Sequence, residues 1–156
     1  MTETQTRITA APAALVYRLL SVLYDSVLVF GMVLLGSALV PLPMGLALPP
    51  ERAAEIQQHW AFGWLMQLIL FGVPVAFHCY FWARGGQTIG MRAWRLRVTD
   101  LNGGQVSLQQ ALIRYVSAWV SALAAGLGFV WSLFDAERMT WHDRWSATRL
   151  VREDRR

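Results

Sequence analysis

The chain has 156 residues, of which 55% are hydrophobic and only 15% are charged, and it contains eight tryptophans. Soluble domains usually carry about 25% charged residues, so this composition excludes an ordinary soluble domain and favours a membrane protein. All fourteen basic residues are arginine and the formal net charge is +4, yet no basic soluble module is left to bind DNA or RNA. We interpret the arginines first as a topology signal, because cytoplasmic loops of membrane proteins are enriched in Arg and Lys.

Long stretches of the chain lack Asp, Glu, Lys and Arg. These stretches are residues 26–50, 56–83 and 115–134. Each can cross about 30 Å of hydrocarbon, since a helix needs about 20 residues for that distance. The sequence therefore predicts an all-α membrane protein with three hydrophobic helical segments. We expect the segments at about residues 14–40, 59–82 and 108–134, a membrane domain over 14–152, and polar tails at 1–13 and 153–156.

The first segment contains two opposite charges, Arg18 and Asp25, inside an apolar run. Residues seven apart lie about two turns apart on one helix face. A charge in hydrocarbon costs on the order of 2.5–3.5 kcal/mol, so such groups usually face protein, a partner or water. The two residues are the first candidates for function, and equally for a buried ion pair that only fixes packing.

The second segment follows a proline-rich linker at about residues 41–58, where prolines should break the first helix. We expect a kink at Pro74 inside this second segment. His78 can carry protons near neutral pH, but we favour a hydrogen-bonded histidine at the interface. Cys79 is expected to be a small apolar packing residue.

The loop after the second segment is rich in arginine. Five arginines from Arg84 to Arg114 face one acid, Asp100, so the positive-inside rule places this loop, and with it the N-terminus, in the cytoplasm. Residues 91–98 alternate roughly as a strand does, and residues 100–104 carry turn chemistry. We therefore expect a short cytoplasmic β-hairpin at the membrane surface.

The third segment begins after Ser107, a good helix N-cap, and contains Gly126 and Gly128 in its second half. One interpretation is a single crossing. The other is a segment broken at the glycines that returns to the cytoplasmic face, which requires that the irregular backbone be buried in protein or line water. Residues 135–156 hold six arginines and five acids. This small excess of arginine weakly favours a cytoplasmic C-terminus, and with it the second, re-entrant geometry.

Taken together, several separated motifs resemble the RDD family of membrane proteins over about residues 14–152. That family is named for an arginine and an aspartate in its first helix and an aspartate near its end. Met91 departs from the pattern, because the family commonly has lysine there. The matching charged positions are Arg18, Asp25, Arg114 and Asp143, and the supporting motif residues are Gly86, Gln87, Thr88, Gly90, His142 and Thr148.

The resemblance implies a small transporter, with cation/proton antiport proposed for some members of a family that is mostly of unassigned function. The residues add a physical route: a carboxylate near arginine stays ionised, and one that loses this partner takes up a proton, so we expect Asp25 as carrier and Arg18 as competing internal cation. The alternative is a scaffold or accessory subunit that docks a partner protein or anionic lipid through its arginine-rich loop and C-terminal motif. We expect a homo-oligomer or a membrane partner, since three helical segments hardly enclose a path. The expected location is a bacterial cytoplasmic (inner) membrane.

An enzyme is the weakest hypothesis. Ser146, His142 and Asp143 are too close in sequence to form a nucleophilic triad. Two neighbouring candidates without a third make a weak metal site, and the glycine pairs lack the lysine of a phosphate-binding loop. We therefore expect no cofactor, no metal and no nucleic acid.

Overall fold

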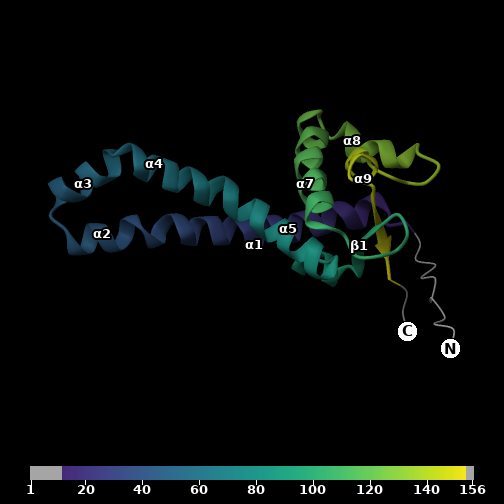
Figure 1. The fold of residues 1–156 in the computed structure, drawn as a ribbon, viewed down its shortest axis with the longest axis horizontal. Coiled ribbons are helices and arrows are strands. Elements are labelled where there is room, and N and C mark those ends of the chain that lie inside the picture. The colour runs from purple at the N-terminus through teal and green to yellow at the C-terminus, as the bar shows by residue number, and fades with distance from the viewer. Residues whose placement is uncertain (1–11, 154–156) are drawn as a thin grey trace. The chain divides into compact units, whose positions relative to one another are not determined.

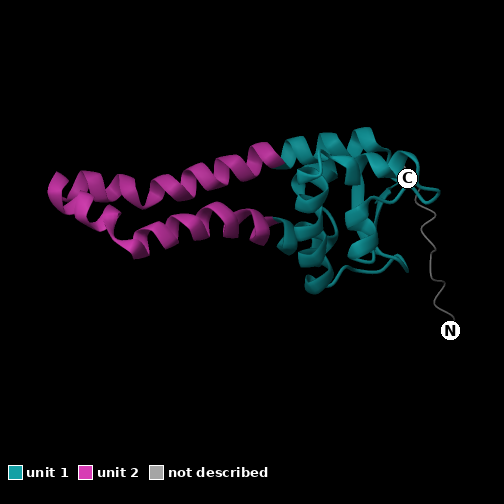
Figure 2. Cartoon of the chain, turned by 90° about the horizontal axis from the view of Figure 1, so that it is seen from above, with its two compact units in different colours: residues 1–25, 78–156 teal, residues 26–77 magenta. Residues whose placement is uncertain are grey.

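The computed structural model describes residues 12–153, which are mainly helical (Figure 1). By contact they divide into two compact units, one formed by residues 12–25 and 78–153 and the other by residues 26–77 (Figure 2). Helix α1 (Leu15–Leu39) and helix α5 (Val73–Gly85) each contribute to both units. The charged residues of interest all belong to the first unit.

Helix α1 ends at Leu39, directly before the prolines at which the sequence predicted the end of the first segment. The linker at 41–58 is itself largely helical, with α2 (Pro41–Ala47) and α3 (Pro50–Gln58). By length and composition, α1 and α2 together form a candidate membrane span over Leu15–Ala47. Pro41 and Pro50 begin their helices, because the first turn of a helix does not use the amide hydrogen that proline lacks.

The second candidate span covers Trp60–Gly85. It consists of α4 (Trp60–Gln67), a π-helical turn η1 (Leu68–Gly72) and α5. The π turn lies directly before Pro74, where the sequence predicted a kink, and such turns accommodate a hydrogen bond that proline cannot make. Within the second unit, Gly36 of α1 approaches this turn closely, since a Cβ on Gly36 would lie 3.1 Å from Ile69.

The third apolar segment is broken, as predicted. Helix α7 (Leu108–Leu123) starts with a capping box in which Ser107 and Gln110 satisfy each other's backbone amides. It is followed, after a bend of 107°, by α8 (Leu127–Val130) and the short 3₁₀ helix η2 (Trp131–Leu133). Gly126 adopts a left-handed conformation at the bend, with φ 77°. By length and composition, residues 12–153 therefore hold two helices able to cross a membrane, or three if this bent pair counts as one.

A small antiparallel sheet joins distant parts of the first unit. Strand β1 (Leu96–Asp100) pairs with β2 (Thr148–Arg152), with Val98 opposite Leu150. The predicted local hairpin was therefore wrong. Residues 100–104 do turn, because the Asp100 carboxylate accepts the amides of Asn102 and Gly104, but the chain then proceeds to α7.

Part of the predicted strand is also helical, since α6 (Ile89–Ala93) precedes β1. The strands pack an apolar core in the first unit: Leu96 and Val98 are almost fully buried, as is Val106 beyond the turn. Ala13 donates its amide to the carbonyl oxygen of Leu150 at 3.2 Å. The sheet therefore connects the start of α1, the loop after α5 and the C-terminal segment.

Candidate functional site

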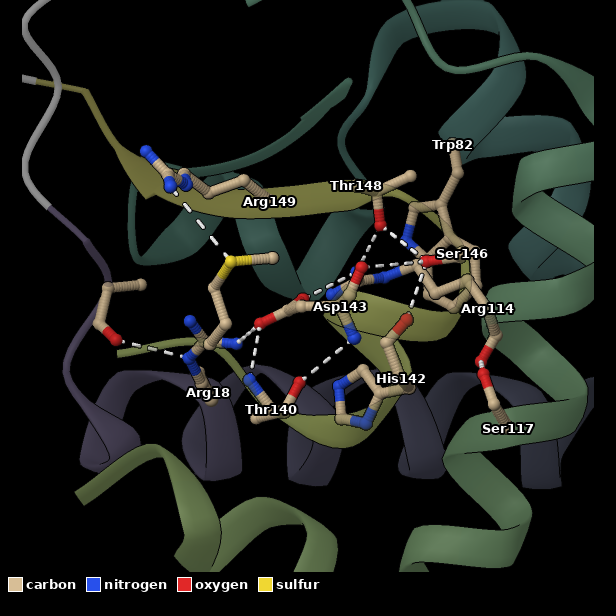
Figure 3. A network of polar contacts seen from close by, with 12 residues as sticks. Arg18, Trp82, Arg114, Ser117, Thr140, His142, Asp143, Ser146, Thr148 and Arg149 are labelled. Carbon is tan, nitrogen blue, oxygen red and sulfur yellow. Dashed lines mark hydrogen bonds and ion pairs between the residues drawn. The ribbon is translucent and has the colours of Figure 1, made fainter. Parts of the chain in front are cut away.

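The centre of the site is Asp143, whose side chain is fully buried between two arginines (Figure 3). Arg18 donates from Nη1 to Asp143 Oδ2 at 2.6 Å, and Arg114 donates from Nη1 to Asp143 Oδ1 at 2.6 Å. We call these three residues the Arg–Asp–Arg cluster. Both guanidinium groups are also buried, so two positive charges share one carboxylate away from water and the three residues carry a net charge of +1.

Short helix α9 (Trp141–Trp145) places this carboxylate. Thr140 caps the helix, and Asp143 Oδ2 accepts the backbone amide of Thr140 at 3.0 Å, which completes a capping box. The aspartate therefore has one oxygen shared between its own helix and Arg18, and another facing Arg114. Such charge-assisted hydrogen bonds are about twice as strong as neutral ones.

The remaining donors of the two arginines also find acceptors. Arg18 donates from Nε to the carbonyl of Ala13 and from Nη2 to that of Arg138, both at 3.1 Å. Arg114 donates to Thr148 Oγ1 at 2.7 Å, and its guanidinium lies 5.5 Å from the centre of the Trp82 ring. The cluster thus ties α1, α7 and the C-terminal segment together.

Asp143 stays ionised at neutral pH. Burial alone would raise the pKa of Asp143, but Arg114 and Arg18 outweigh it and hold that pKa well below its usual range. Burial lowers the pKa of His142 to about 3, assisted by the positive charge of Arg114. Its ring lies 3.5 Å from Ser121 Oγ and packs against Phe129. His142 is therefore a neutral packing group beside a permanent carboxylate.

Asp25 lies in a different environment. Its carboxylate is 4% exposed and accepts a hydrogen bond from Thr88 Oγ1 at 2.5 Å and one from the backbone amide of Gly90 at 2.8 Å. Among residues 12–153, no arginine or histidine forms an ion pair with it. The sequence suggested an Arg18–Asp25 pair on one helix face, and this suggestion was wrong because each residue binds a different segment.

The glycine-rich motif before β1 makes the approach of Asp25 possible. Thr88 caps α6 by accepting the amide of Met91 at 3.3 Å. A Cβ on Gly90 would lie 2.6 Å from the carbonyl oxygen of Ser21 and 2.9 Å from Asp25. Gly86 has φ 68°, and a Cβ there would come within 2.5 Å of Val98 O. These two glycines are required by the backbone geometry.

Other motif residues have structural contacts. Gln87 donates to the carbonyl of Leu96 at 2.9 Å and to Glu153 at 3.3 Å. Thr148 connects Arg114 to Ser146 through a hydroxyl contact of 2.7 Å. The sequence did not lead us to predict Thr140 as a helix cap, although a Thr-x-x-Asp pattern before a helix is a capping signal. Its spacing from Asp143 was sufficient to find it.

Two features of residues 12–153 bear on ligand binding, the distribution of metal-ligating side chains and an open groove. In the described part of the chain, no three side chains of the metal-ligating types gather. An open groove of about 650 Å³ lies in the second unit, lined by Val40, Met44, Leu48, Arg52, Ile56 and Leu65 among others. The Arg–Asp–Arg cluster and Asp25 belong to the other unit.

Apolar helices of spanning length, with the first of them held by a buried charged network, define a helical membrane protein. The model of the RDD family matches residues 12–147, and the chain belongs to that family. The comparison with curated proteins and the comparison with solved structures gave no match.

Proposed function

We propose that this protein is a small membrane transporter that exchanges a cation for protons, with Asp25 as the proton-binding group. The contrast between its two buried aspartates carries the proposal. Asp143 is neutralised by two arginines at 2.6 Å, whereas the described residues give Asp25 a hydroxyl and an amide as hydrogen-bond partners and no ion pair. Two carboxylates in environments this different can take different roles, one fixed and one exchanging.

The Thr88 hydroxyl supports reversible protonation of Asp25. A hydroxyl can donate to an ionised carboxylate, and it can accept from a protonated one. The Gly90 amide donates in both states. Asp25 therefore keeps both hydrogen bonds whether or not it carries a proton, and only the charge of the site changes. A cation that competes with the proton for this charge would be coupled to it.

The same proposal assigns a fixed structural role to Arg18, Arg114 and Asp143, and no enzymatic step or cofactor to the chain. A path across the membrane requires more helices than one copy has, so we propose a homo-oligomer or a membrane partner. We place the protein in a bacterial inner membrane, with the arginine-rich loop and the N-terminus in the cytoplasm, following the positive-inside rule.

Flux in proteoliposomes tests this function. The native chain is compared with Asp25→Asn at matched incorporation, using a pH-sensitive dye inside the vesicles and sodium, potassium or lithium outside. The control is Glu137→Gln, which removes a carboxylate of an exposed ion pair with Arg149. We expect cation-driven proton flux in the native and control proteins and none in Asp25→Asn. Absence of flux in all three proteins across the panel would contradict the proposal.

A second candidate function is docking of anionic lipid. Arg84, Arg92 and Arg95 are exposed, and the described residues offer none of them a carboxylate partner. Arginines near an anionic leaflet contribute about 1 kcal/mol each. Retention of phosphatidylglycerol over phosphatidylcholine in detergent, lost when all three become glutamine, would support docking. Equal retention of both lipids would exclude it. The control replaces the paired Arg52, Arg144 and Arg149.

A further inference from the structure

Two segments of the chain fold in the same way 52 residues apart. Thr88 caps the five-residue helix α6 with φ −75° and ψ 173°, and Thr140 caps the five-residue helix α9 with φ −83° and ψ 169°. In each case the threonine hydroxyl accepts the amide three residues later at 3.3 Å. The two helices therefore begin with the same cap and have the same length.

The two helices also end alike. Each C-cap residue, Trp94 or Ser146, has ψ near zero and is followed by a residue with positive φ, Arg95 at 56° and Ala147 at 50°. Non-glycine residues rarely adopt this conformation. In both segments the next residue begins a five-residue strand. The repeated use of an uncommon backbone angle at the same position indicates one structural unit used twice.

The sheet pairing follows the same relation. Val98 lies opposite Leu150, which is its equivalent at an offset of 52. Adding 52 to Leu96 gives Thr148, and adding 52 to Asp100 gives Arg152. Swapping the two segments therefore turns the outer pair Leu96–Arg152 into the other outer pair, Thr148–Asp100. The pairing therefore has an approximate two-fold axis through its centre. Threonine at the cap and arginine at the fifth and tenth positions are identical in the two segments.

The two segments differ at the third helical position. In residues 140–152 this position is Asp143, which accepts the amide of its cap residue and binds Arg18. In residues 88–100 it is Met91, which has no carboxylate. We infer that residues 88–100 and 140–152 are two copies of one unit, and that α1 supplies Asp25 as the acid for the first turn of the copy that has Met91 at the third helical position. Asp25 accepts hydrogen bonds from the Thr88 hydroxyl and the Gly90 amide there, whereas Asp143 accepts the amide of Thr140 itself.

The residue before this position explains the difference between the copies. The first copy has Gly90, beside which Ser21 and Asp25 of α1 come within 3 Å of where a Cβ would stand. The second copy has the buried ring of His142 there. Of the two copies, the first has a glycine at this position, and its missing side chain leaves room for α1 to bring Asp25 against α6. Asp25 is a positioning residue for α6, a role that does not depend on transport.

A rescue experiment tests this inference on the full chain in detergent. The proteins are the native chain, Asp25→Asn, Met91→Asp and the double variant, with Tm measured by tryptophan fluorescence. We expect Asp25→Asn to lower Tm by about 4 °C or more, and Met91→Asp to recover at least half of that loss. In the native background we expect Met91→Asp to lower Tm, because it places a second carboxylate near the first.

Two further variants make the result specific. Met91→Glu, closer to methionine in length, should rescue as well, because glutamate at the third helical position also forms a capping box. Ile89→Asp adds an acid at an exposed position of the same first turn and should not rescue. The inference would be overturned if Met91→Asp and Met91→Glu each changed Tm by the same amount in the native and the Asp25→Asn backgrounds. Rescue of Tm by Ile89→Asp would also overturn it. Flux is measured separately, so a loss of Tm rescue and a loss of transport remain distinguishable.

Discussion

Arg18 and Asp25 are neighbours on one face of α1, yet Arg18 binds Asp143, 125 residues away, while Asp25 binds Thr88, 63 residues away. The first contact is an ion pair and the second is a hydrogen bond to a neutral group. Helix α1 is therefore attached to the rest of its unit at two points of different chemistry. Substitutions at the two points should have separable effects.

Replacing Asp143 with asparagine should severely destabilise the protein. The change leaves two buried guanidinium groups with no balancing charge, and breaking a buried pair in this way costs about 3–5 kcal/mol. We expect a large fall in the melting temperature in detergent and loss of the monodisperse peak in size exclusion. Glu137→Gln, at an exposed pair, should change neither. A native melting temperature in Asp143→Asn would show that the cluster is not structural.

The buried His142 should make stability fall as the solution is acidified below neutral pH. The folded chain keeps the pKa of His142 at about 3, whereas an unfolded histidine has a pKa of about 6.5. The unfolded state therefore binds a proton first, and the free energy of unfolding drops by up to about 1.4 kcal/mol per pH unit below 6.5. We expect this slope between pH 6.5 and 5 in chemical denaturation.

His142→Gln should remove most of that slope, and His59→Gln, at an exposed histidine, should retain it. Asp143 contributes in a separate window, because its depressed pKa stabilises the folded state above about pH 3.9 and loses this effect only as the pH falls further. An unchanged slope in His142→Gln would refute the assignment.

Adding one methyl group at Gly90 should separate α1 from α6. The new Cβ would lie 2.6 Å from the carbonyl oxygen of Ser21, a backbone atom that cannot easily move. Overpacking of this kind costs about 1–3 kcal/mol. We expect Gly90→Ala to lower the melting temperature, while Gly31→Ala, where no atom lies within 4 Å of the new methyl group, should not. Equal melting temperatures for the two variants would contradict the close approach.

Introducing a lysine at position 91 should keep Asp25 ionised. Met91 follows Gly90, whose amide binds Asp25, so an ammonium group here is expected to reach the carboxylate. A nearby opposite charge favours the ionised form of an acid. Under the proposed function, Met91→Lys should abolish proton flux and Met91→Leu should leave flux intact. Because Met91 is buried and accepts from Trp82 Nε1, the two variants are compared at matched incorporation of folded protein. Native flux in Met91→Lys would argue against Asp25 as the proton carrier.

The apolar helices and their charged residues were visible in the sequence for simple physical reasons. A membrane span requires a long stretch without charge, and an arginine or aspartate inside one must find a partner. Those rules identified Arg18 and Asp25 and, through the family resemblance, Asp143. The break at Gly126 was also visible, because few other residues adopt positive φ so easily.

The partners of these residues were not visible, because their contacts are non-local. Nothing near Val98 indicates that its strand pairs with Leu150 rather than with the residues after the turn. The helical start of α2 at Pro41 was missed for a different reason: proline breaks a helix in its interior but begins one well. In both cases the local pattern was compatible with two structures, and tertiary packing selected between them.

The separation between Arg18 and Asp143 has a consequence for biosynthesis. A ribosome completes α1 long before it reaches α9, so a first helix that inserts as it is made would do so while its arginine still lacks its carboxylate. The guanidinium is then expected to stay near the lipid headgroups. The docking of α1 onto Asp143 therefore comes late in synthesis, and nascent chains arrested before residue 140 should lack it.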